Sequence, residues 1–238
     1  MNREKFFEYL RRRDGHLFGT SLSQRQVDGL DALLDAGDGL PLPHMAQVLS
    51  ESHHETGGGM YPVKETVFPH SKAKNPSDAT VIARLDRAYA KGQLPWVKVP
   101  YWRGGFFGRG VIQLTHEYNY RKASAVCAVD LVSNPGRALD LPISATIAVQ
   151  GCVTGMFTGK KLSDFDGPEY DHYNARSIVN GDKKANGGKI KAAALEFERA
   201  LEAAGWGAEP PKPAAAHPDP AEQPQGLLAW LLSLFRGA

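Results

Sequence analysis

Apolar residues recur at three- and four-residue intervals through most of the first two hundred positions, and almost no stretch alternates apolar and polar residues. This helical period predicts a mainly α fold. Ser23 and Gln26 form a capping box for one helix, and three glycines from Gly57 end the next. Glycines, prolines and aromatic residues between 92 and 110 predict a loop or a short strand pair instead. The expected helices lie near residues 6–10, 23–37, 43–55, 78–91, 116–127, 142–158 and 189–204.

The composition of the chain changes after Trp206, where prolines and alanines replace the helical pattern. We therefore expect a folded domain over residues 1–207, a semi-rigid linker over 208–226 and an apolar tail over 227–238. The tail is too short to span a bilayer. Its apolar surface predicts either shallow insertion of residues 227–236 at a membrane interface or docking on an apolar groove of the domain or of a second copy.

The overall charge is nearly balanced, because 28 basic residues face 26 acidic ones among 238. Such a balance argues against a nucleic-acid partner. The first thirteen residues lack an apolar signal region, so we expect synthesis in a cytosol without an export leader. Cys127 and Cys152 are too few for a disulfide framework or a zinc site and are interpreted as buried thiols.

The charges are unevenly distributed along the chain. Residues 60–125 hold eleven basic and four acidic residues, a local net charge of +7, interleaved with five large aromatic residues between Trp96 and Phe107. Cations beside aromatic rings suit an anionic sugar polymer or a single-stranded nucleic acid. Tyr101 and Arg109 are the candidate ligand-binding residues of this stretch.

Two carboxylates are candidates for acid and base chemistry. Glu55 shares a helical stripe with Met45 and Ser52, so it faces inward at the last turn, where desolvation favours the protonated form that a general acid needs. Glu65 follows a glycine-rich reversal that could bring it across a cleft from Glu55, as glycoside hydrolysis requires. The alternative interpretations are a polar residue at a frayed helix end and a surface glutamate.

Metal and nucleophilic chemistry have weaker support in the sequence. The zinc-hydrolase motif His-Glu-x-x-His fails because Gly58 occupies the position of its second histidine. The nucleophile elbow Gly-x-Ser-x-Gly is absent from the sequence. We therefore expect catalysis without a metal or another cofactor.

Three segments together resemble glycoside hydrolase family 19, which contains the plant-type chitinases and the lysozyme-like endolysins of phages. They occur in the family's order and extend the resemblance over about positions 43–204. The segments are Ala46-Gln47 with His53-His54-Glu55-Thr56-Gly57-Gly58, then Phe107-Gly108-Arg109-Gly110-Val111-Ile112-Gln113-Leu114-Thr115-His116-Glu117-Tyr118-Asn119-Tyr120, then Asn174-Ala175-Arg176-Ser177-Ile178-Val179-Asn180-Gly181.

The resemblance implies a mainly α, two-lobed, lysozyme-like fold with a central cleft, and a metal-free, inverting hydrolysis of β-1,4 bonds between N-acetylated sugars. Glu55 matches the general acid of the family, and Thr115 matches the residue that holds the attacking water. Glu65 follows Glu55 by ten residues, a spacing similar to that of the general base in the phage endolysin branch. The residues that match positions binding sugar or flanking the acid are His54, Gln113, Asn119 and Asn180.

Peptidoglycan is the expected substrate, because its peptides carry carboxylates that the +7 stretch would attract, whereas chitin is neutral. The expectation is a monomeric muramidase-like endolysin that acts on the cell wall. A chitinase, a lytic transglycosylase and a cell-wall-binding protein without activity remain alternatives. The last of these has no need for Glu55, Glu65 and Thr115 together.

Overall fold

The computed structural model describes residues 1–207 except 13, 16 and 66–74. Residues Met1–Gly207 form one compact unit. The predicted linker and tail, residues 208–238, lie outside the described residues, as do two cations of the basic stretch, Lys72 and Lys74. The α-helices are α1 (Arg3–Leu10), α2 (Gln24–Ala36), α3 (Leu42–Glu55), α4 (Asp78–Ala90), α5 (Glu117–Cys127), α6 (Leu141–Thr154), α7 (His172–Ala175) and α8 (Lys183–Ala203).

Strands and 3-10 helices occupy short segments between these helices. Strand β1 (Val63–Lys64) pairs antiparallel with β2 (Arg109–Gly110). The 3-10 helices are η1 (Tyr101–Gly104), η2 (Pro135–Leu139), η3 (Leu162–Phe165) and η4 (Arg176–Ile178). The expected mainly α class is confirmed, and the strand pair predicted between 92 and 110 forms with only one of its strands inside that range.

Helix boundaries follow the local signals closely at α2 and less closely at α8. Ser23 caps α2, and its side chain and that of Gln26 bond reciprocally as a capping box. Helix α8 begins at Lys183, six residues before the expected start. Gly187 allows this extension, because a Cβ there would lie 2.9 Å from the ring of Tyr173, so the helix approaches Tyr173 only through a glycine.

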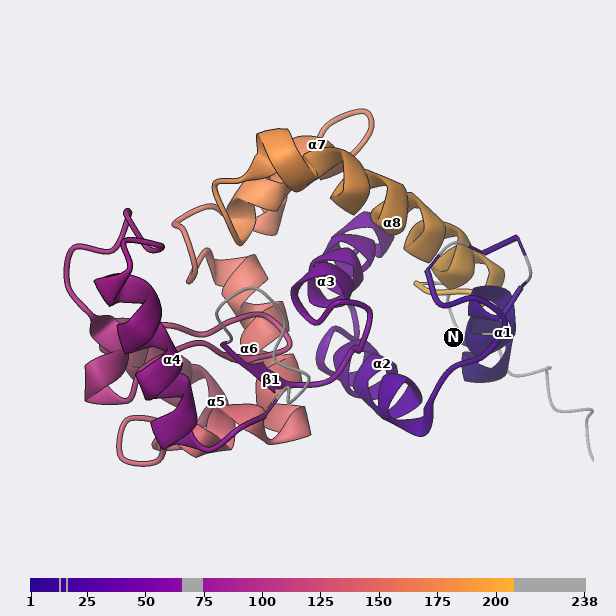
Figure 1. Cartoon of the computed structure of the whole chain (residues 1–238). Coiled ribbons are helices and arrows are strands. Elements are labelled where there is room, and N and C mark those ends of the chain that lie inside the picture. Colours follow the sequence, from indigo (N-terminus) through magenta and orange to yellow (C-terminus); the bar gives the residue numbers. More distant parts are fainter. Residues whose placement is uncertain (13, 16, 66–74, 208–238) are drawn as a thin grey trace, which may run out of the picture. The chain divides into compact units, whose positions relative to one another are not determined.

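Helix α3 occupies the centre of the main core. It packs chiefly on α8 and also contacts α2 and α6 (Figure 1). The side chains around it are fully buried and apolar, among them Leu30, Leu49, Val149 and Phe197. This packing fixes α3 rigidly, so the residue at its C-terminal end has a fixed position.

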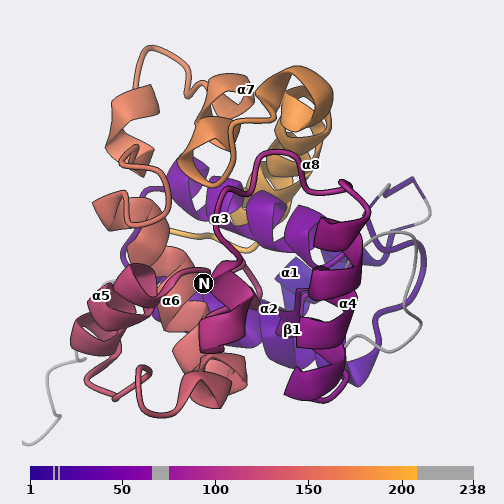
Figure 2. The same cartoon turned by 60° about the vertical axis from the view of Figure 1, so that its left-hand side comes forward.

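Two smaller clusters form the part of the unit that contains α4 and α5, and Figure 2 shows these helices as its two sides. Val81 of α4 packs with Trp102 and Phe107, and Tyr120 of α5 packs with Leu131. The segment between α4 and α5, which carries η1 and β2, is therefore held from both sides.

The described helices and the two cysteines form no membrane span and no disulfide bond. Within the described residues, every helix is too short or too polar to cross a membrane. Cys127 is half-buried and Cys152 is buried, and both are free thiols, as predicted.

Candidate active site

Glu55 is the last residue of α3, and the helix ends there because Gly57 and Gly58 adopt positive φ values of 59° and 78°. The stripe below it is buried, with Met45 and Ser52 fully covered. The side chain of Glu55 is 16% exposed. The helix therefore presents one carboxyl group at the boundary between the core and the surface.

A single guanidinium holds this carboxyl group. Arg176 Nη1 donates to Glu55 Oε1 over 2.7 Å and also to Glu51, one turn earlier on α3. The Nε of Arg176 donates to Asp182 Oδ1 over 2.7 Å. Arg176 is 1% exposed and Glu51 is fully buried. Three carboxyl groups thus share one buried cation, which fixes the position of Glu55.

Glu51 experiences a strongly desolvated environment. Burial raises its pKa from the ordinary 4.5 to about 8, although the neighbouring Arg176 acts in the opposite direction. Gln47 donates to Glu51 Oε1 over 2.9 Å, and the Gln47 side-chain oxygen lies 2.8 Å from Nδ1 of His172. These hydrogen bonds connect Glu51, which lies next to Glu55 on α3, to His172 of α7.

Glu65 lies directly after β1, with both carboxyl oxygens bonded. Tyr101 Oη donates to Oε1 over 2.7 Å, and the backbone N–H of Gly108 donates to Oε2 over 2.8 Å. A Cβ at Gly108 would lie 2.3 Å from Gln113 Oε1 and 3.2 Å from the Cβ of Glu65, so only glycine fits between them. Burial and the nearby Glu65 raise the pKa of Tyr101, which keeps its hydroxyl a donor.

Two amide oxygens of the segment after β2 lack hydrogen-bond partners among the residues that the structure describes: Oε1 of Gln113 and Oδ1 of Asn119. A buried polar atom without a partner is costly, and in native proteins it indicates a ligand or water site. Both residues resemble sugar-binding positions of family 19. Their free oxygens are consistent with that role.

His116 separates Thr115 from α5 in a strained conformation, with φ at 68°. Its ring lies 4.5 Å from that of Tyr101 and stacks on Tyr118 at 5.4 Å. Desolvation lowers the pKa of His116. Because Tyr101 bonds Glu65, these rings join His116, the residue after the half-buried Thr115, to the residues around Glu65.

Arg109 has a different role from the expected contact with ligand. Its guanidinium is 1% exposed and donates to the carbonyl oxygen of Gly105 over 2.8 Å, to Tyr120 Oη over 2.9 Å and to Asp78 Oδ2 over 2.8 Å. With its donors turned inward, Arg109 joins α4, α5 and the loop before β2. We therefore correct the expectation that Arg109 binds ligand and assign it a structural role.

Several cations of the positively charged stretch, residues 60–125, are already paired with acidic residues. The acidic residues Asp78, Asp86 and Glu117 each bind cations from the same stretch, which lowers the field available to an anionic ligand. These ion pairs join Lys64 and Arg109 to Asp78, Arg103 to Asp86, and Arg121 to Glu117.

The contacts sort the proposed site residues into two groups. The first group contains Glu55, His54 and Asn180. His54 directly precedes Glu55 in the chain. Asn180 is exposed, and its backbone N–H donates to the carbonyl oxygen of Arg176, the residue that binds Glu55. Burial, aided by Arg176, lowers the pKa of His54. In the second group, Tyr101 bonds Glu65 and Gln113 lies close to it across Gly108, whereas Thr115 and Asn119 are assigned to the group because they follow Gln113 in the same stretch of chain. The structure thus places the two glutamates in separate, individually supported settings.

Sequence reasoning missed Glu51, Arg176 and Asp182 as functional residues. One signal was available for Glu51, because it lies four residues before Glu55 on the same helix face. Arg176 carries no local signal, since its partners on α3 are 121 and 125 residues away in the chain. Among the described residues, groups of three or more potential metal ligands are absent.

The raised pKa of Glu51 predicts a pH-dependent stability. Between about pH 4.5 and 8 the folded protein holds one more proton at Glu51 than the unfolded chain does, so the free energy of unfolding falls as the pH rises through this window. The expected slope is about 1.4 kcal/mol per pH unit. Denaturant titrations of the wild type at several pH values measure it.

The matched variant is Glu51→Gln, which cannot titrate. Its free energy of unfolding should not fall as the pH rises from about 4.5 to 8. The difference in unfolding free energy between the variant and the wild type should therefore grow steadily over this pH range. An equal pH slope in both proteins would show that Glu51 titrates normally in the folded state.

Comparison with known proteins identifies a family. The profile of glycoside hydrolase family 19, described as chitinase class I, matches residues 36–157. Chitinase 11 of rice, Oryza sativa subsp. japonica, is 48% identical over 40 residues, which cover 17% of this chain and 16% of the rice protein. The matched segment is thus a small part of that relative.

Two solved structures are similar to this chain at low sequence identity. A bacterial family 19 chitinase has a TM-score of 0.44 at 19% identity, covering 88% of this chain and 96% of its own. Chitinase C from Streptomyces griseus has a TM-score of 0.41 at 20% identity, covering 88% of this chain and 78% of its own.

Proposed function

This chain belongs to glycoside hydrolase family 19, and we propose that within this family it is an endolysin that hydrolyses the β-1,4 bonds of peptidoglycan. Membership of this family makes the chain a glycoside hydrolase. The observation that supports the mechanism best is the pair of glutamates in different electrostatic settings, which acid and base roles require.

In this mechanism Glu55 protonates the leaving glycosidic oxygen. Arg176 fixes the orientation of the Glu55 carboxyl group, and the carboxylate of Asp182, which pairs with the same guanidinium, offsets its positive charge. Partial burial at the helix end excludes bulk water from the transferred proton. Glu55 then becomes a carboxylate, and Arg176 stabilises the charge that it acquires.

Glu65 acts as the base that deprotonates the attacking water. Tyr101 and the Gly108 N–H donate to its two oxygens and fix the orientation of the carboxyl group. Thr115 holds the water on the face of the sugar opposite Glu55. Gln113, Asn119 and Asn180 bind the acetylated sugars, the first two with amide oxygens that lack partners among the described residues.

Peptidoglycan is preferred over chitin because cations of residues 60–125, including Lys98 and Lys122, form no ion pair with a described residue and can attract the carboxylates of the peptides. A chitinase is the second candidate, and the matching segment of rice chitinase 11 favours it. Cleavage of isolated peptidoglycan compared with soluble chitin oligomers decides between them. An anhydro product end in place of a reducing end would indicate a lytic transglycosylase.

The assignment of Glu65 and Thr115 predicts the stereochemistry. The first product should carry the inverted α anomer, because water attacks directly from the face opposite the leaving group. Proton NMR of products within the first turnovers, before mutarotation, measures this. The carboxyl groups of Glu55 and Glu65 should lie roughly 6.5 to 9.5 Å apart.

A β anomer formed first would contradict the role of Glu65 as base, since retention requires a covalent or substrate-assisted intermediate. Glu65→Gln supplies the complementary test. It should lose activity on the same substrate while Glu117→Gln, a change in an exposed ion pair, should retain it.

A further inference from the structure

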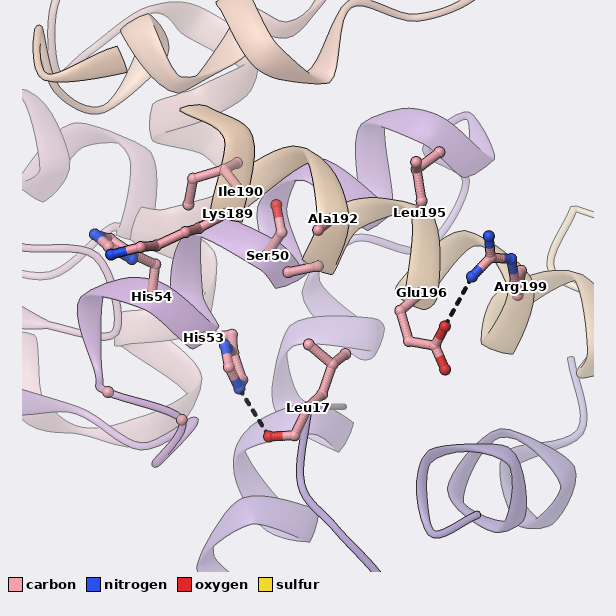
Figure 3. A pocket seen from close by; sticks show the side chains of 13 residues that line it. Leu17, Ser50, His53, His54, Lys189, Ile190, Ala192, Leu195, Glu196 and Arg199 are labelled. Atoms are coloured by element: carbon pink, nitrogen blue, oxygen red, sulfur yellow. Dashed lines mark hydrogen bonds and ion pairs between the residues drawn. The ribbon is translucent and has the colours of Figure 1, made fainter. Parts of the chain in front are cut away.

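A pocket of about 620 Å³ lies between the C-terminal end of α3 and α8, closed at one side by the loop at Leu17 (Figure 3). Leu17, Ile190, Ala193 and Leu195 make its wall largely apolar. The size and the mixture of an apolar wall with a few polar groups are typical of a small-ligand or peptide site. The catalytic scheme above makes no use of it.

The pocket adjoins the acid through the chain itself. His54 and Gly57 both line it, and they flank the dipeptide Glu55-Thr56. His53, also in the wall, bonds the carbonyl of Leu17 over 3.2 Å and so fixes the loop against α3. A ligand that occupied the pocket would therefore contact the residues on either side of Glu55-Thr56 in the chain.

Charges at the rim favour an anionic ligand. Lys189 is exposed, lines the pocket near His54 in Figure 3, and forms no ion pair with a described residue. Glu196 is shared by Arg12 at 3.3 Å and Arg199 at 2.9 Å, and Arg12 also pairs with Asp14 at 3.6 Å, so these four charges balance. Burial lowers the pKa of His53 and of His54, so neither histidine adds charge near pH 7, and the positive excess at the rim comes from Lys189.

We propose that this pocket binds the peptide stem of peptidoglycan while the glycan lies at Glu55. The inference rests on the proposed function, which it deepens by naming a second recognition element. A stem combines small apolar alanine side chains with free carboxylates, which suit the largely apolar wall and the cation Lys189 at its rim. Chitin has neither feature, so the pocket would distinguish the two polymers.

The experiment compares intact peptidoglycan with the same material after an amidase has removed the stems. The wild type should cleave intact peptidoglycan with a lower KM than the stripped glycan. Lys189→Glu should raise KM on intact peptidoglycan about fivefold, the size of one exposed charge interaction. On the stripped glycan its KM should equal that of the wild type.

Two further variants separate binding in the pocket from general effects. Lys191→Glu makes the same charge change at an exposed position of α8 that does not line the pocket, and it should leave both KM values unchanged. Ala192→Phe fills the pocket from an exposed position and should raise KM on intact peptidoglycan alone. Ala185→Phe, exposed on the same helix away from the pocket, is its control.

Equal wild-type KM values on the two glycans, or Lys189→Glu and Ala192→Phe variants that change both substrates alike, would overturn the inference while leaving the glycosidase function intact. A wild type that cleaves chitin oligomers but neither peptidoglycan preparation would overturn the proposed function, and the stem site with it.

Discussion

Glu55→Gln is expected to lower kcat on peptidoglycan roughly 10² to 10⁴-fold, the range typical for loss of a general acid. Glutamine keeps the size and a side-chain oxygen that can accept from Arg176, but it has no proton to give to the leaving oxygen. The fall in turbidity of permeabilised cells and the release of reducing ends measure the loss. KM should change little, because the sugar contacts remain.

The control for this prediction is Glu117→Gln, which removes a carboxylate from an exposed ion pair on α5 and should keep full activity. Circular dichroism and thermal unfolding establish that both variants fold. A folded Glu55→Gln protein with more than about a tenth of the wild-type kcat would place the acid elsewhere.

Arg176→Met is expected to destabilise the protein by about 3 to 5 kcal/mol, because the change removes the buried guanidinium that pairs with Glu55 and Asp182 and donates to the buried carboxyl group of Glu51. Activity should fall too, since Glu55 loses the donor that orients it. Chemical denaturation measures the stability. The double variant Glu51→Gln with Arg176→Met should recover part of the lost stability, because it removes the unpaired buried carboxyl group.

The matched surface change is Arg137→Met, which breaks an exposed pair with Asp140 and should cost less than about 1 kcal/mol. A similar small cost for Arg176→Met, or a double variant less stable than the sum of its single changes, would show that the Arg176 cluster contributes little to the fold.

The sequence predicted those parts of the fold that depend on neighbouring residues. The capping box at Ser23 and the glycines after Glu55 determine helix ends locally, and both predictions are confirmed. The start of α8 escaped the same reasoning. Gly187 and Gly188 resemble a helix breaker, whereas the tight approach to Tyr173 that explains Gly187 is a tertiary contact.

The site was less accessible to local reasoning. The inward stripe of α3 correctly indicated a half-buried Glu55, because helical periodicity determines which face a residue shares. The charge count misinterpreted Arg109, since its partner Asp78 is 31 residues away and only folding reveals that the pair is buried. Arg176 was missed for the same reason. Long-range ion pairs leave no periodic signal in a sequence.

The separation of Arg176 from Glu55 along the chain has a consequence for biosynthesis. Both glutamates leave the ribosome early, but the cation that positions Glu55 follows 121 residues later. Closure of the unit comes later still, when the carbonyl of Ala204 accepts from the N–H of Asn2 over 2.7 Å. A nascent or prematurely terminated chain therefore carries Glu55 and Glu65 without the cation that orients Glu55, so under the proposed mechanism hydrolysis begins only after translation of α8.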